Sequence, residues 1–164
     1  MRILVLGVGN ILLTDEAIGV RIVEALEQRY ILPDYVEILD GGTAGMELLG
    51  DMANRDHLII ADAIVSKKSA PGTMMILRDE EVPALFTNKI SPNQLGLADV
   101  LSALRFTGEF PKKLTLVGVI PESLEPHIGL TPTVEAMIEP ALEQVLAALR
   151  ESGVEALPRE AIHD

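Results

Sequence analysis

The amino-acid sequence predicts an α/β fold, a three-layer sandwich in which a mostly parallel, twisted sheet of about five strands is flanked by helices. Hydrophobic residues make up 48% of the chain and aromatic residues only 3%, so the apolar mass is aliphatic. Such a composition favours buried parallel strands over an aromatic-rich β-sandwich. Short runs of Ile, Val and Leu also alternate with helical patterns. The length of 164 residues suits one domain, which we expect over 1–153, followed by a frayed polar tail over 154–164.

The strands are predicted from apolar runs, most of which are short, continuous and rich in Ile, Val and Leu. In chain order these runs are 2–7, 36–39, 57–61, 73–77 and 114–120. The stretches 64–72 and 79–90 are predicted as loops, because Lys, Pro and Gly residues interrupt their periodicity.

The helices are predicted from apolar residues at three- and four-residue spacing. The first begins near Thr14, a suitable N-cap, and extends to Tyr30, and the second covers 43–52. The third begins at Ser91, where Ser91 and Gln94 match a capping box and Pro92 takes the first helical position. The last covers 131–152, with a kink expected at Pro140.

Charge and cysteine content exclude several classes of function. The formal net charge is −12, which disfavours nucleic acid and anionic membranes as partners and favours a monomer that meets a basic protein surface. The absence of cysteine excludes disulfides and thiolate metal sites. No apolar run reaches the roughly 18 residues of a membrane span, and no signal-peptide cleavage pattern follows the N-terminus. We therefore expect a cytoplasmic protein.

Unusual polar residues gather where the predicted strands end. The first strand runs into a Gly-x-Gly turn, Gly7–Gly9, as in a dinucleotide-binding unit, but Asp15 and Glu16 follow and would repel a phosphate. The segment "DGGTAG", 40–45, follows the second strand, and Asp62 follows the third. Asn93 lies in the first turn of the helix that begins at Ser91. All of these positions fall on the carboxyl edge of a parallel sheet.

Each of these residues also has a structural interpretation. Asp15 and Glu16 can complement a helix N-terminus, and Asp62 can cap a turn. His57 is expected at the opposite edge of the sheet, and His127 is a loop histidine for which a surface position is the simpler interpretation. No serine lies in a Gly-x-Ser-x-Gly elbow. Two carboxylates that meet at a sheet edge nevertheless indicate a cation, a basic group or a shared proton.

The stretch "GVGNILLTDEAIGV", together with "DGGTAG", "IIADA" and the "SPNQ" helix start, resembles the maturation endopeptidases of nickel–iron hydrogenases along essentially the whole chain. The resemblance implies an enzyme that removes a C-terminal extension from the hydrogenase large-subunit precursor after nickel insertion. It also implies a cleft that contacts a divalent metal, the nickel carried by the precursor, through Glu16, Asp62 and the residue at position 93. Glu16 and Asp62 would then be the catalytic carboxylates, with the metal polarising the scissile carbonyl or activating water.

Two departures from the family pattern are visible. The usual Asp-Glu-Gly sequence reads Asp15-Glu16-Ala17, and Asn93 stands where the family has histidine. An amide oxygen is a weaker ligand than imidazole for nickel-like ions and does not shuttle protons near neutral pH. The departure at Asn93 leads us to expect weaker metal binding and a low-activity or inactive enzyme. A relative with altered metal ligation, or rescue by His127, is the alternative.

Two other functions remain open from the sequence. A Rossmann-like nucleotide- or cofactor-binding module would use Asp40 for a ribose hydroxyl, although Leu12 occupies the position of the third glycine. A non-catalytic chaperone would bind the precursor in a metal-dependent manner without cutting it.

Overall fold

The structure, a computed structural model, describes residues 1–87 and 92–162. Within them, five strands form one sheet in the order β3-β1-β4-β6-β5. These strands are β1 (Ile3–Val8), β3 (Val36–Gly42), β4 (His57–Ala63), β5 (Met74–Arg78) and β6 (Leu114–Val119). Only β5 runs antiparallel to its neighbour, and the other pairs are parallel. The predicted α/β sandwich with a mostly parallel sheet is confirmed.

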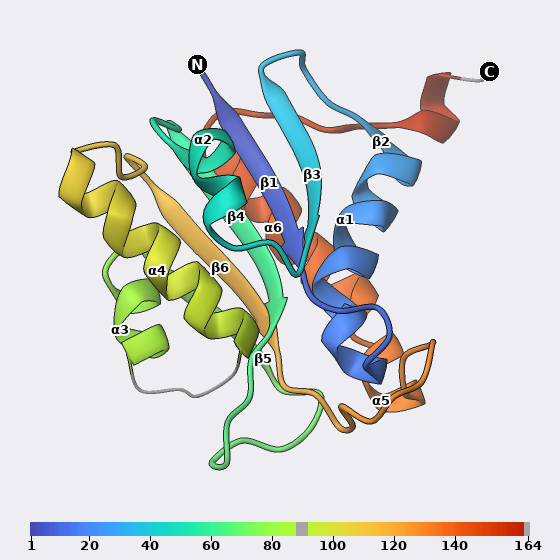
Figure 1. Cartoon of the computed structure of the whole chain (residues 1–164). Coiled ribbons are helices and arrows are strands. Elements are labelled where there is room, and N and C mark those ends of the chain that lie inside the picture. Colours follow the sequence, from blue (N-terminus) through green and yellow to red (C-terminus); the bar gives the residue numbers. More distant parts are fainter. Residues whose placement is uncertain (88–91, 163–164) are drawn as a thin grey trace.

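The central strands are buried on both faces, as their uninterrupted apolar sequences require. Every residue of β1, β4 and β6 is buried, whereas β3 and β5 at the two edges are partly exposed. Ile3 pairs with Val36 on one side and with His57 on the other, so the three strands begin at the same level. Their carboxyl ends consequently meet at one edge, which we call the carboxyl edge and which lies at the bottom of Figure 1.

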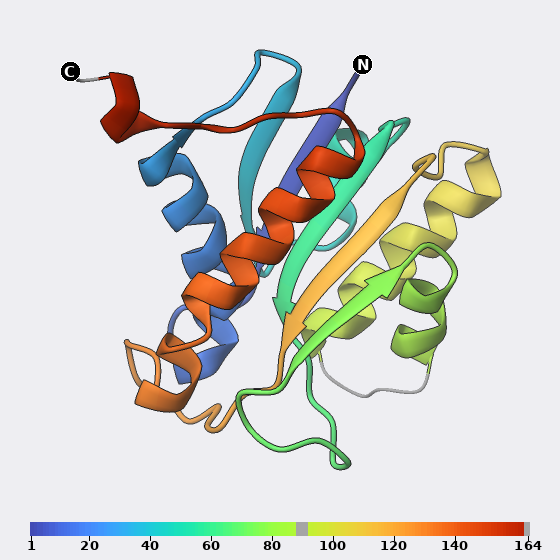
Figure 2. The same ribbon diagram turned by 180° about the vertical axis from the view of Figure 1, so that it is seen from behind.

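Helices cover both faces of the sheet (Figures 1 and 2). One face is covered by α1 (Ile18–Arg29) and α6 (Ile138–Glu151), and the other by α2 (Leu49–Met52), α3 (Glu81–Thr87) and α4 (Pro92–Thr107). The remaining short elements are β2 (Tyr30–Ile31), β7 (Leu157–Pro158), α5 (Pro132–Glu135), and the 3₁₀ turns η1 (Thr14–Ala17), η2 (Met46–Leu48) and η3 (Arg159–Ile162). In α4, the residues at three- and four-residue spacing, Leu97, Val100, Leu101 and Leu104, are all buried as predicted.

Three predictions of local structure are wrong. The stretch predicted as a loop at 79–90 contains α3, whose Val82 and Phe86 are buried against the sheet; residues 88–90 lie outside the described part of the chain. The segment after 153 is not frayed throughout, because β7 pairs with β2 in a small antiparallel ribbon. The C-terminal helix breaks before Ile138, between α5 and α6, and not at Pro140. Pro140 lies in the first turn of α6, where a missing N–H costs little.

The starts of two predicted helices also differ. The second predicted helix begins at Met46 rather than at residue 43. Thr14 does not cap the first helix: it begins η1 with a φ of 49°, and its hydroxyl donates to the Glu125 carbonyl. Pro92 opens α4 as predicted, whereas Ser91 lies outside the described residues. Among the described residues, no helix is long and apolar enough to cross a bilayer.

Candidate metal-contacting site at the carboxyl edge

The turn after β1 places Glu16 over the end of the sheet. Gly9 has a φ of 142°, and a Cβ at this position would overlap the Glu16 carbonyl, so only glycine allows the chain to pass this close. A Cβ at Gly19 would overlap the carbonyls of Val8 and Ala61, so the start of α1 rests directly on the ends of β1 and β4. The Glu16 side chain stays half-buried, and its Oε1 accepts a hydrogen bond of 3.2 Å from the backbone amide of Asn10.

Asp62 lies on β4, one residue before the strand ends, and is 1% exposed. Among the described residues, its Oδ2 is the buried side-chain oxygen or nitrogen without a hydrogen-bond partner. Burial holds the pKa of Asp62 well above its usual value; the Ala63 amide lowers it, and the nearby Glu16 charge raises it further. A buried, unpartnered carboxylate oxygen is costly and indicates a function that the fold alone does not explain.

Glu16 lies close enough to Asp62 for its charge to raise the pKa of Asp62. Partial burial raises the pKa of Glu16, and the Asn10 amide opposes this increase. Both carboxylates therefore hold protons more readily than free side chains do, and a cation placed between them would relieve their repulsion. The Oδ2 of Asp62, which accepts no hydrogen bond, and the half-buried Glu16 carboxylate are oxygen donors of the type that divalent metals bind.

The third predicted metal contact is Asn93. The backbone of Asn93 lies in the first turn of α4, and its side chain is outside the part that the structure describes. In the described residues, no group of three or more His, Asp or Glu side chains is arranged to hold a metal ion.

Asp15 is separate from this pair. It is fully buried and points into the segment 122–131. Its Oδ2 accepts hydrogen bonds from the amides of Glu122 (2.9 Å) and Ser123 (3.0 Å), and its Oδ1 accepts one from the Thr131 amide (2.8 Å). The Thr131 hydroxyl also donates to this carboxylate. Asp15 therefore holds two distant chain segments together, and both of its oxygens already accept hydrogen bonds.

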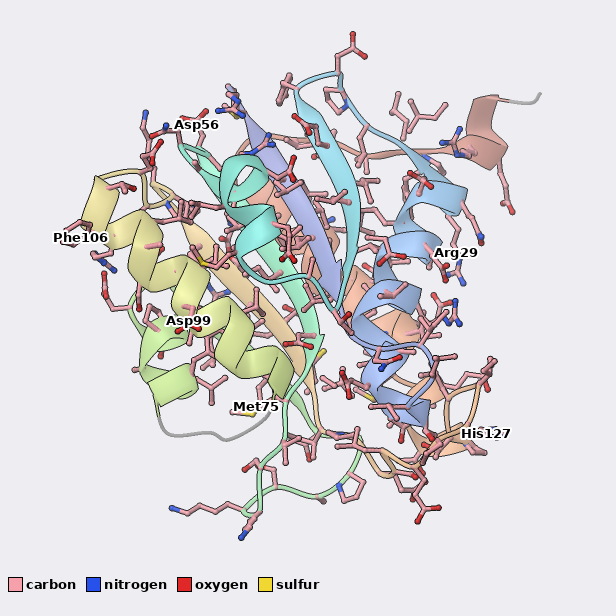
Figure 3. All side chains as sticks on the ribbon, in the orientation of Figure 1. Arg29, Asp56, Met75, Asp99, Phe106 and His127 are labelled. Atoms are coloured by element: carbon pink, nitrogen blue, oxygen red, sulfur yellow. The ribbon has the colours of Figure 1, made fainter. Side chains whose placement is uncertain are left out.

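The other predicted polar residues fall into two groups. Asp40 lies near the carboxyl edge, where its Oδ1 accepts a hydrogen bond from the Gly42 amide. Together with Gly9–Leu12, Gly42 and Thr43 it lines an open pocket of about 320 Å³ beside the turn that carries Asn10. His57 begins β4 at the opposite edge, as expected, and is buried between the hydroxyls of Ser152 and Thr115. His127 is exposed at the carboxyl edge (Figure 3).

Sequence reasoning missed the contribution of the segment 122–131 to this edge. Its backbone pairs with the turn before η1, because the Thr14 amide donates to the His127 carbonyl and the His127 amide to the Leu12 carbonyl, both at 2.9 Å. Polar residues in a loop carry no spacing that reveals such a distant partner. Asp15 was the residue that could have indicated this contact, because a carboxylate in that position requires hydrogen-bond donors, and here they come from the segment 122–131.

A family model and the sequences of known proteins match this chain. The family model described as hydrogenase maturation protease matches residues 20–148. The chain is 98% identical over 164 residues to hydrogenase 2 maturation protease from Escherichia coli (strain K12), with 100% of both chains covered. It is 48% identical over 161 residues to the hydrogenase expression/formation protein HupM from Azotobacter chroococcum, covering 97% of this chain and 77% of the relative.

A solved structure agrees with these matches. The hydrogenase maturating endopeptidase HybD from E. coli superimposes with a TM-score of 0.96 at 97% sequence identity, covering 98% of this chain and 99% of that chain. The matched fold and the family match over 20–148 lead to one assignment. The chain belongs to the hydrogenase maturation proteases, and it is a peptide-bond hydrolase of the endopeptidase type.

Proposed function

We propose that this protease removes a C-terminal extension from the large-subunit precursor of a nickel–iron hydrogenase once nickel has been inserted. The observation that carries the proposal is the pair of carboxylates at the carboxyl edge, in which Asp62 keeps a buried oxygen without a hydrogen-bond partner beside Glu16. The E. coli relative named as hydrogenase 2 maturation protease supports the choice of a hydrogenase as substrate.

The two carboxylates suit a metal that arrives with the substrate. Because the described residues offer two acidic ligands and no cluster of three, the nickel would retain ligands from the precursor while it contacts Glu16 and Asp62. This requirement makes contact depend on nickel loading. The dependence on nickel loading also distinguishes the proposed enzyme from a protease that carries its own catalytic metal.

In the proposed reaction, water adds across the scissile peptide bond. Its hydroxyl forms the new carboxyl terminus of the large subunit, and its proton passes to the amine of the released extension. We assign the proton of the attacking water to ionised Glu16, because this side chain is only half-buried and reaches solvent. Asp62 lies fully buried and would secure the metal. Nickel in the precursor would supply Lewis-acid polarisation of the scissile carbonyl.

Asn93 weakens the metal contact in this proposal, since an amide oxygen is a poorer ligand for nickel than imidazole. We expect Asn93→His to raise the affinity for free Ni²⁺, measured by calorimetric titration, and to lower the KM for nickel-loaded precursor. If neither quantity changes, position 93 does not contact the metal.

The function is tested by the intact mass of a nickel-loaded large-subunit precursor after incubation with this chain. Loss of a C-terminal peptide is expected, and nickel-free precursor should remain uncut. Glu16→Gln is the matched control and should leave the precursor uncut. It removes the carboxylate charge but keeps the size of the side chain and an oxygen that accepts from the backbone amide of Asn10. An unchanged precursor mass with both this chain and Asn93→His would contradict the proposal.

A further inference from the structure

Four aliphatic side chains are exposed next to the candidate site. Ile11 and Leu12 are 40% and 55% exposed, and Leu124 and Ile128 are 39% and 67% exposed. We call these four residues the apolar rim. Single exposed aliphatic residues are ordinary, but four on two adjoining segments form a surface that calls for an explanation.

The two halves of the apolar rim come from distant parts of the sequence. Ile11 and Leu12 belong to the turn after β1, and Leu124 and Ile128 to the segment that follows β6. The amides of Thr14 and His127 join these segments through the backbone, and the Thr14 hydroxyl donates to the Glu125 carbonyl. His127, between the two residues of the second half, lies at the carboxyl edge in Figure 3.

The apolar rim is continuous with the carboxylate pair. Asn10 precedes Ile11, and its amide donates to the Glu16 carboxylate. Ile11 and Leu12 also line the open pocket of about 320 Å³, together with Asp40 and Gly42. A protein that reaches Glu16 from solvent would therefore meet the apolar rim at the same time.

The charges beside the apolar rim are acidic. Glu122 and Glu125 are exposed on the segment of its second half, and neither forms an ion pair within the described residues. The chain as a whole carries a net charge of −12. A complementary partner would present aliphatic side chains bordered by lysine or arginine.

We propose that the apolar rim is the surface on which the hydrogenase precursor docks, and that Asp15 is the positioning residue that keeps its two halves together. This inference rests on the proposed function, since it identifies the partner with the substrate. Asp15 accepts hydrogen bonds from Glu122, Ser123 and Thr131, the residues that bracket the second half. It also directly precedes Glu16, so one short segment sets both the docking surface and the metal contact.

The docking surface is tested with the double variant Leu12→Ser/Ile128→Ser. Both side chains are more than half exposed, so the fold should tolerate the change. The control is Phe106→Ser, which removes an apolar side chain that is 93% exposed at the far end of α4 (Figure 3). The measurements are the Kd for nickel-loaded precursor, by titration, and the KM and kcat of cleavage.

We expect the Kd and the KM of the double variant to rise at least tenfold while kcat changes less than twofold, and Phe106→Ser to leave all three unchanged. Equal Kd values in the double variant and the control would overturn the inference. A change in sedimentation from dimer to monomer with an unchanged Kd would overturn it as well, because the apolar rim would then join two copies of this chain. Tight binding without cleavage by the unsubstituted chain would count against the proposed function alone.

The role of Asp15 is tested with Asp15→Asn and, as a milder change, Thr131→Val. The first replaces an oxygen that faces two amides with an amide group, and the second removes only the hydroxyl donor. Both variants should raise the KM more than they lower kcat and should speed amide hydrogen exchange over 122–131. A fall in kcat at constant KM would overturn this role for Asp15.

Discussion

Asp15 and Asp62 show how partners decide the role of a buried carboxylate. Both side chains are almost completely inaccessible to solvent. Asp15 accepts hydrogen bonds on both oxygens, so its charge is compensated and it serves the architecture. Asp62 has one oxygen without a partner and a raised pKa, so its ionised form is unfavourable in the fold. Burial alone would not separate the two roles.

The metal-free protein should become more stable when Asp62 is replaced by Asn. The folded-state pKa of Asp62 lies above its unfolded value, so its contribution to stability is fully present at low pH and is lost as the pH rises through the folded-state pKa. Asp62→Asn should therefore raise the free energy of unfolding at pH 7 by on the order of 1 kcal/mol. Cleavage of nickel-loaded precursor should be abolished.

Urea unfolding with a chelator present checks this expectation. The stabilisation should shrink as the pH falls towards 4, because Asp62 is then protonated in the unsubstituted protein as well. A variant that is less stable at pH 7 would show that the Asp62 charge has a compensating partner.

His57 has the opposite dependence on pH at the other edge of the sheet. Burial lowers the pKa of His57 from 6.5 to about 4, and its ring is held between the hydroxyls of Ser152 and Thr115. The stability that its neutral ring contributes is complete above pH 6.5 and is lost as the pH falls to about 4. The loss approaches about 3 kcal/mol, since each pKa unit corresponds to about 1.4 kcal/mol.

His57→Gln isolates the contribution of His57. The carboxylates titrate in the variant and in the unsubstituted protein alike, so their effect cancels in the difference in free energy of unfolding. The variant should be less stable at pH 7, and the difference in free energy of unfolding should shrink between pH 6.5 and 4.5. Parallel curves across that range would show that His57 does not titrate with a lowered pKa.

At the scale of the elements, the strongest patterns predicted the structure well. Continuous apolar runs gave β1, β4 and β6, because a strand that is buried on both faces needs apolar residues throughout. α3 was missed because Pro83 lies in a short segment next to residues that suit a turn. β7 was missed because two exposed residues have no pattern of their own and are ordered only by pairing with β2.

The candidate site could be predicted to a similar extent. Glu16 and Asp62 were predicted to lie together because parallel strands end at one edge; Asp62 lies near the end of β4, and the Glu16 charge acts on it. The role of Asp15 was not predictable, since its donors come from residues more than 100 positions away in the sequence. The contact of Asn93 with a metal stays a prediction, because its side chain is not described.

The small β2–β7 ribbon should contribute to stability and not to cleavage. Two contacts hold the C-terminal segment 157–159 against the protein. β7 pairs with β2, and the Arg159 guanidinium donates a hydrogen bond to the Glu27 carbonyl. Ending the chain at Ala156 removes both and should lower the free energy of unfolding by roughly 1–2 kcal/mol, as expected for a few partly exposed hydrogen bonds. A matched thermal-unfolding and cleavage assay checks this, and a fall of kcat/KM greater than threefold would contradict it.

At the scale of the whole molecule, charge should govern how fast the substrate is found. The net charge of −12 and the exposed acids Glu122 and Glu125 beside the apolar rim favour a basic partner surface. Raising the ionic strength from about 0.01 M to 0.15 M shortens the screening length from about 30 Å to about 8 Å. The association rate with the precursor should therefore fall severalfold, whereas the dissociation rate should change little. Stopped-flow mixing measures both, and an association rate that does not depend on salt would exclude electrostatic steering.

The candidate site and the N-terminus lie at opposite ends of the sheet. Ile3 starts β1, so the N-terminus lies at the end of the sheet away from the carboxyl edge, and the β2–β7 ribbon lies towards the same end (Figure 1). An affinity tag or a surface linker at the N-terminus would therefore orient immobilised protein with Glu16 and the apolar rim towards solution. The same geometry makes the protein suitable for sensor-based measurements of precursor capture, in which every attached molecule presents the same face.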